Sequence, residues 1–152
     1  MSLFKIAFHL TFSRMVAEII SFIVFACGLV VFTMSIGAGR GLIRGLIYMS
    51  IGAAITLLIK LTLFDERPCS GDFLCPFDSG IISGHALTSM MFALSFYNRK
   101  EFILFFLISL LVSYSRIFFG FHDLAQVARS LAIAVLAYYA LGVLTGGAHK
   151  KG

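Results

Sequence analysis

The chain has 152 residues, of which 60% are hydrophobic and only 12% are charged, and its formal net charge is +5. Because a soluble domain carries roughly 25% charged residues, the composition excludes an ordinary soluble protein and predicts a polytopic membrane protein. At roughly 20 apolar residues per spanning helix, there is room for about five spans. We therefore expect residues 1–152 to form one all-α transmembrane domain, since lipid offers backbone groups no other partners.

The predicted helices follow one another along most of the chain. Residues 1–14 are too short to span a bilayer and mix basic residues with Phe and Leu, which predicts a short N-terminal interfacial helix. Longer apolar runs predict spanning helices at residues 17–36, 45–64, 82–97, 102–119 and 124–144. Gly37, Gly41 and Gly45 are spaced by four. This pattern either brings helices close together or, as the neighbouring arginines favour, forms a flexible connection.

Basic residues fall in pairs between the apolar runs and after the last one. The pairs are Arg40 and Arg44, Arg99 and Lys100, and Lys150 and Lys151. This is the positive-inside pattern of a multi-pass protein of a bacterial-type inner (plasma) membrane, and it explains the basic charge without nucleic-acid binding. With these pairs in the cytoplasm, residues 65–81 and 119–123 face the periplasmic, or extracytoplasmic, side.

A first polar cluster lies near the end of the second predicted span. Lys60 and Arg67 are seven residues apart, and Pro68 ends a helix directly after them. An ammonium and a planar guanidinium both suit the non-bridging oxygens of a phosphate, although each also suits the lipid headgroup region. Cys69 and Cys75 follow in the same outer loop, either as a disulfide favoured by an oxidising compartment or as two thiols.

A second cluster opens the third predicted span. Ser83 suits the capping position of a helix, and Gly84 lets backbone N–H groups approach an anion at the positive end of the helix dipole. His85, one residue further, is placed to give a proton to a leaving oxygen. A capped helix that happens to carry a polar histidine is the alternative interpretation.

A third cluster joins the fourth and fifth predicted spans. It contains Arg116 and, after five further residues, His122. Gln126 lies one helical turn from His122 on the same face, so its carbonyl oxygen is expected to accept one imidazole N–H and leave the other ring nitrogen as a nucleophile. Asp123 is adjacent in sequence but points about 100° away on an ideal helix. Arg129 either supplements a phosphate pocket or pairs with Glu18.

In order and spacing, the clusters resemble the type 2 phosphatidic acid phosphatase superfamily, which shares its site with the vanadium haloperoxidases. The family pattern is Lys, six residues and Arg-Pro; then Pro-Ser-Gly-His; then Ser-Arg, five residues, His, three residues and Asp. The chain is similar over about residues 60–128. It departs at Ile82, which stands in place of the family Pro, and at Gln126, which stands in place of the Asp that orients the nucleophilic histidine.

The resemblance implies an integral membrane lipid phosphatase that hydrolyses a phosphate mono- or pyrophosphate ester without a metal or other cofactor. It implies that His122 attacks phosphorus to form a phosphohistidine and that His85 protonates the leaving oxygen. The residues that would hold the phosphate oxygens are Lys60, Arg67, Ser83, Gly84 and Arg116. The partners implied are the lipid bilayer and a lipid phosphate: undecaprenyl diphosphate, phosphatidylglycerophosphate, phosphatidate or lipid A phosphate.

Other interpretations remain open from the sequence. Gln126 brings no negative charge, so either turnover is slower, or Asp123 substitutes, or the chain is a phospholipid-binding membrane protein of the same fold without turnover. A metal-dependent enzyme is a further alternative, because several acids fall on the outer side: Asp65, Glu66, Asp72, Asp78 and Asp123. The predicted fold has one span before the first cluster where the family has two, which leaves a homo-oligomer open.

Overall fold

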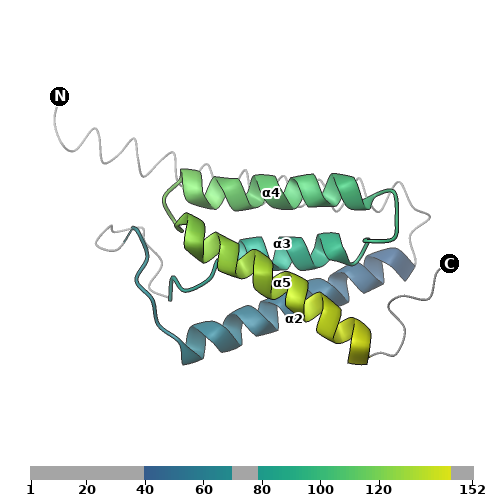
Figure 1. Cartoon of the computed structure of the whole chain (residues 1–152), viewed down its shortest axis with the longest axis horizontal. Coiled ribbons are helices and arrows are strands. Elements are labelled where there is room, and N and C mark those ends of the chain that lie inside the picture. The colour runs from purple at the N-terminus through teal and green to yellow at the C-terminus, as the bar shows by residue number, and fades with distance from the viewer. Residues whose placement is uncertain (1–39, 70–78, 145–152) are drawn as a thin grey trace.

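The computed structural model describes residues 40–69 and 79–144, and these residues form an all-helical structure (Figure 1). Its helices are α2 (Arg40–Thr62), α3 (Gly84–Leu94), α4 (Phe102–Phe118) and α5 (Leu124–Leu144). Helix α3 packs against the other three helices, whereas α4 and α5 contact each other only slightly. The predicted interfacial helix and the predicted span at residues 17–36 lie outside the described residues.

In the described part of the chain, two helices are long and apolar enough to cross a bilayer, Ile43–Thr62 within α2 and Leu124–Leu144. Helix α4 is apolar but has 17 residues, and α3 has only 11. At about 1.5 Å per residue, α3 is roughly 16 Å long, about half the hydrocarbon thickness of a bilayer. The prediction of about five full spans is therefore not confirmed, and the third predicted span is corrected to a short helix.

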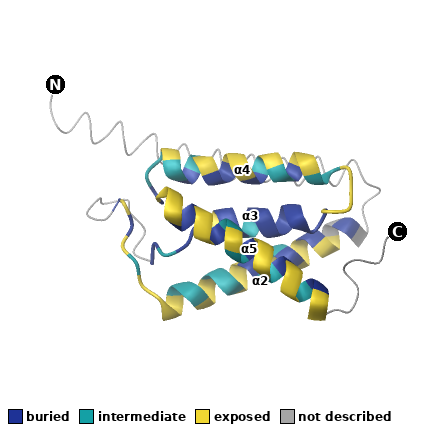
Figure 2. Cartoon of the chain, viewed as in Figure 1, coloured by how far each residue is buried: buried dark blue, intermediate teal, exposed yellow. Residues whose placement is uncertain are grey.

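Burial explains why an apolar run misled this prediction. Figure 2 shows α3 in the colour of buried residues along most of its length, and Leu87, Met91 and Ala93 are fully buried between the other helices. The apolar run continues beyond the helix because Phe96, in the turn that follows α3, is also buried, against Phe92 and Phe105. Residues that are buried in the protein and residues that contact lipid are both apolar. An apolar run therefore does not show where a helix ends.

Glycines on α2 allow the close approach of α3. A Cβ atom at Gly45 would lie 2.7 Å from the ring of Phe92, and one at Gly52 would lie 3.1 Å from Leu87. Gly41 and Gly45 lie inside α2, so the flexible connection favoured from the sequence is wrong for these two residues. The neighbouring arginines suggested a turn, but the packing surface of α3 decides the conformation, because small residues let two helix backbones come together.

The helix ends that carry the polar clusters meet at one end of the structure. Helices α2 and α4 end there, while α3 and α5 begin there, at the left of Figure 1. Lys60 therefore lies in the last turn of α2 and Arg116 in the last turn of α4. The fold brings together segments that the sequence separates by more than 50 residues, as the contact between Arg67 and His122 shows.

Candidate active site

A pocket of about 470 Å³ opens at this end of the structure. Six of the nine predicted site residues line it: Lys60, Arg67, Gly84, His85, Arg116 and His122. The remaining lining residues are Ala53, Thr56 and Leu57 of α2 and Thr88 of α3. The pocket thus combines three cations and two histidines with uncharged side chains from two helices.

Arg67 is held in the pocket by a close contact between two loop segments. Its side chain is buried, and the backbone N–H of Gly80 donates to the carbonyl oxygen of Asp65 at 2.7 Å. The Ser79 hydroxyl accepts the Asp65 N–H at 3.0 Å. A Cβ atom at Gly80 would lie 2.9 Å from the Glu66 carbonyl oxygen and 3.1 Å from the Arg67 Cα. Only glycine therefore permits the segment with Arg67 to lie this close.

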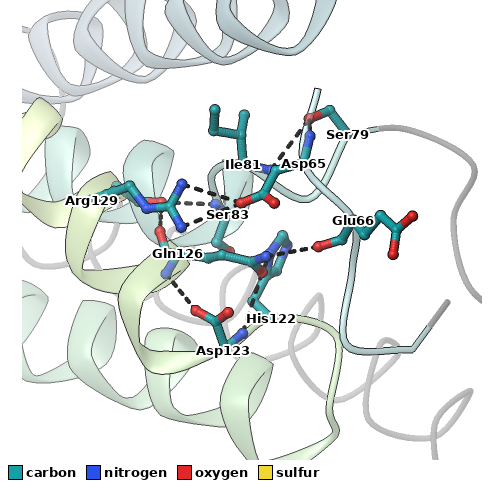
Figure 3. A network of polar contacts seen from close by, with 10 residues as sticks. Asp65, Glu66, Ser79, Ile81, Ser83, His122, Asp123, Gln126 and Arg129 are labelled. Atoms are coloured by element: carbon teal, nitrogen blue, oxygen red, sulfur yellow. Dashed lines mark hydrogen bonds and ion pairs between the residues drawn. The ribbon is translucent and has the colours of Figure 1, made fainter. Parts of the chain in front are cut away.

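The backbone fixes the orientation of the Gln126 amide and, through it, the tautomer of His122 (Figure 3). The amide oxygen accepts the backbone N–H of Asp123 at 3.3 Å, and the amide nitrogen donates to the Glu66 carbonyl at 3.0 Å. Because neither backbone group can exchange its role, the Gln126 oxygen faces His122 Nδ1, 3.0 Å away. An oxygen acceptor requires that Nδ1 carry the proton. The hydrogen bond matches the one-turn spacing of the two residues.

The other ring nitrogen of His122, Nε2, keeps a lone pair, and His122 lines the pocket. Arg67 Nη1 lies 3.4 Å from His122 Nε2, so the guanidinium donates to this lone pair. Burial lowers the pKa of His122 from its ordinary 6.5 to about 4, and the charges of Arg67, Lys60 and Arg116 lower this pKa further, while the hydrogen bond to Gln126 opposes them. The imidazole is therefore neutral at physiological pH and has a basic Nε2 beside three cations.

We predict that His122 titrates far below an ordinary histidine in the ligand-free protein. The imidazole should stay neutral until the pH falls to about 4. Because the unfolded chain binds this proton near pH 6.5, the folded state should lose stability as the pH falls from 6.5 toward 4. Nitrogen NMR of the imidazoles, assigned with His122→Gln, measures the pKa directly; a value near 6.5 would show that the ring is not enclosed as described.

Ser83 and Asp123 have a different place from the one predicted. Ser83 is fully buried and is the N-cap of α3, where its hydroxyl accepts the Ala86 N–H at 3.4 Å, and it does not line the pocket. Asp123 Oδ1 accepts the Gln126 N–H at 2.7 Å and so caps the start of α5. Since Gln126 is the hydrogen-bond partner of the imidazole, the alternative in which Asp123 orients His122 is corrected. Both side chains thus cap the N-termini of helices, Ser83 that of α3 and Asp123 that of α5, beside the pocket.

The two further arginines at this end differ in their surroundings. The Arg116 guanidinium is buried and lies over the ring of Phe121, 4.4 Å from its centroid, which holds its charge at the pocket wall. Arg129 instead pairs with Asp65 at 3.3 Å, and both side chains are exposed. The acidic partner considered for Arg129 from the sequence, Glu18, lies outside the described residues. Arg129 is absent from the pocket lining, so the pocket contains three cations and not four.

Three supporting groups were missed from the sequence: Gly80, the Glu66 carbonyl and Ser130. The Ser130 hydroxyl accepts the Ser83 N–H at 2.7 Å and donates to the Gln126 carbonyl at 2.8 Å, so it joins the starts of α3 and α5. Ser130 lies one turn beyond Gln126, and this polar face of an apolar helix was a usable signal. The sequence contains no comparable signal for Gly80 or Glu66, because these residues act through their backbone atoms and through contacts with distant parts of the chain.

Cys69, just after Arg67 and Pro68, is disulfide-bonded, whereas Cys75 lies outside the described residues. Within residues 40–69 and 79–144, no group of three or more His, Cys, Asp and Glu side chains is arranged to hold a metal ion.

No family model, curated protein or solved structure matches the chain. The residues of the pocket and their geometry are therefore the basis for assigning a function.

Proposed function

We propose that the protein is a membrane lipid phosphatase that hydrolyses a phosphate mono- or pyrophosphate ester through a phosphohistidine at His122. The observation that carries this proposal is the pocket, in which a neutral histidine, protonated on Nδ1 and unprotonated on Nε2, lies among three cations. Phosphoryl transfer depends mainly on positioning and on electrostatic stabilisation of the phosphoryl oxygens. Lys60, Arg67 and Arg116 supply that stabilisation from three different helix ends or loops.

The proposed chemistry gives a separate role to each of the two imidazoles that line the pocket. When the substrate binds, the Arg67 N–H turns from His122 Nε2 to a phosphoryl oxygen and frees the Nε2 lone pair. This lone pair attacks phosphorus, and the bond from phosphorus to the leaving oxygen breaks while protonated His85 gives that oxygen its proton. The Gln126 oxygen holds the Nδ1–H of the phosphohistidine throughout. In the second half, neutral His85 takes a proton from water, the water oxygen attacks phosphorus, and the P–N bond breaks. Inorganic phosphate leaves and His122 regains its lone pair.

The apolar surroundings support a lipid as the substrate. Leu57 lines the pocket, and it is exposed on α2 together with Leu58 and Leu61, with Phe64 exposed just beyond the helix. These side chains suit a hydrocarbon tail beside a phosphate head. We place α2 and α5 across a bacterial-type inner membrane, with the first and fourth predicted spans completing a multi-pass bundle around the short helix α3. The pocket then faces the extracytoplasmic side, where the oxidising compartment favours the disulfide at Cys69.

Phosphate release from purified protein in detergent tests the proposal. Phosphatidate, phosphatidylglycerophosphate, undecaprenyl diphosphate and lipid A should be offered in parallel, with and without EDTA. We expect release from at least one lipid, unchanged by the chelator. Activity lost with EDTA and restored by a divalent ion would favour a metal-dependent enzyme. Phospholipid binding without release from any of the lipids would instead favour the binding protein that lacks turnover.

A further inference from the structure

Gln126 contacts two parts of the site that have different tasks. Its side chain is buried, with 1% of its surface exposed, and it lies behind the pocket rather than in its lining. The amide oxygen contacts His122, four residues earlier, while the amide nitrogen contacts the Glu66 carbonyl, 60 residues earlier. Figure 3 shows both hydrogen bonds leaving the same side chain.

The contact with Glu66 bears directly on Arg67, the next residue in the chain. The Glu66 carbonyl accepts the Gln126 amide N–H at 3.0 Å, and the position of a Cβ atom at Gly80 is only 2.9 Å from the same oxygen. The peptide between Glu66 and Arg67 is thus bound by Gln126 and closely packed against Gly80. A shift of this peptide would move the Arg67 guanidinium away from His122 Nε2.

We propose that Gln126 is a positioning residue that couples the nucleophile His122 to the anion-binding Arg67 through its two amide atoms, and that its N–H donor is essential. The assignment of roles to His122 and Arg67 rests on the proposed function. An ionised carboxylate has acceptors only. Asp or Glu at this position would therefore place a carboxylate oxygen against the Glu66 carbonyl oxygen, and the two oxygens would repel each other. The neutral amide is therefore required here, and a carboxylate should impair the site rather than improve it.

The test uses inorganic phosphate as the probe, because binding needs no turnover. Gln126→Glu keeps the chain length and the acceptor for His122, replaces the amide donor by a second acceptor and adds a negative charge. We expect the dissociation constant for phosphate to rise about tenfold or more, as for loss of one buried hydrogen bond. The pKa of His122 should rise at the same time, since a carboxylate beside Nδ1–H stabilises the imidazolium. Phosphate affinity equal to that of the original protein would overturn the proposal.

An added negative charge alone would also weaken phosphate binding, and Arg67→Ala separates the two effects. If Gln126 acts by placing Arg67, Gln126→Glu should cost less than about threefold in the Arg67→Ala background, because coupled residues are non-additive. The same tenfold loss in both backgrounds would contradict the coupling. Gln126→Met is the neutral second variant: it should lose about tenfold in phosphate affinity without a rise in the His122 pKa, and affinity within about threefold of the original would count against the proposal.

Two further variants complete the test, one as a control and one as a second way to displace the peptide before Arg67. Arg129→Met breaks the other link from α5 to this loop, but that link is an exposed ion pair and should change phosphate affinity by less than about threefold. Gly80→Ala would push against the Glu66–Arg67 peptide, so it should lose phosphate affinity, and the His122 pKa should rise because the Arg67 charge that lowers it moves away. A protein that shows these effects but releases no phosphate from any lipid would exclude the proposed function and leave this inference standing.

Discussion

His122→Ala should abolish phosphate release, with a fall in kcat on the order of 10⁴ to 10⁶, the loss typical of an enzyme without its nucleophile. No other imidazole is held as His122 is, with Nδ1 on Gln126 and Nε2 facing Arg67, among the residues that the structure describes. Steady-state phosphate release from the preferred lipid measures the effect.

Inorganic phosphate binding is the control for folding of this variant. Lys60, Arg67 and Arg116 remain in the pocket of His122→Ala, so the variant should still bind phosphate within about tenfold of the original affinity. A variant that binds phosphate and releases none locates the defect in the chemical step. Phosphate release at more than about a tenth of the original rate would reject His122 as the nucleophile.

His85→Ala should slow hydrolysis by about 10² to 10⁴ for a lipid phosphate, whose leaving oxygen is strongly basic and needs a proton. With p-nitrophenyl phosphate, whose leaving group departs as a stable anion, the loss should be about tenfold or less. His85 is exposed and lines the same pocket as the buried His122, which gives it access to a leaving group directed outward. The ratio of kcat for the two substrates measures the proton donation.

Lys60→Met is the matched control for this comparison. Lys60 lines the same pocket and is assigned to non-bridging oxygens, whose charge is similar for the two substrates. The variant should therefore lose about 10² to 10³ in kcat with both. Equal losses for both substrates in His85→Ala, as in Lys60→Met, would mean that His85 acts on phosphate oxygens and not as an acid.

The sequence predicted the helices well where length and apolar pattern agree. The predicted spans at residues 102–119 and 124–144 nearly match α4 (Phe102–Phe118) and α5 (Leu124–Leu144). The third predicted span was too long because Phe96 is buried in a turn, and apolar periodicity does not distinguish a turn in the core from a further helical turn. The predicted start of α2 was late because Arg40 and Arg44 were interpreted as a loop, although helix residues near a membrane surface also carry charge.

The sequence pointed to most of the charged and imidazole side chains that the fold brings together in the pocket. Lys60, Arg67, His85, Arg116 and His122 meet in one pocket, and their types and spacing already pointed to an anion. Ser83 and Asp123 were predicted to act on substrate or nucleophile, but both cap helices. Residues that act through the backbone, such as Gly80, have no side-chain chemistry to detect, and their role follows only from the fold.

Phosphohistidine survives in alkali and is hydrolysed in acid, and this difference identifies the residue that receives the phosphoryl group. The purified protein should be mixed with ³²P-labelled lipid phosphate, quenched in alkali within milliseconds, and mapped by peptide mass spectrometry. We predict label on His122 that is lost in acid and that is absent from His122→Ala. Efficient turnover without any labelled histidine, or with label only on another residue, would contradict the account.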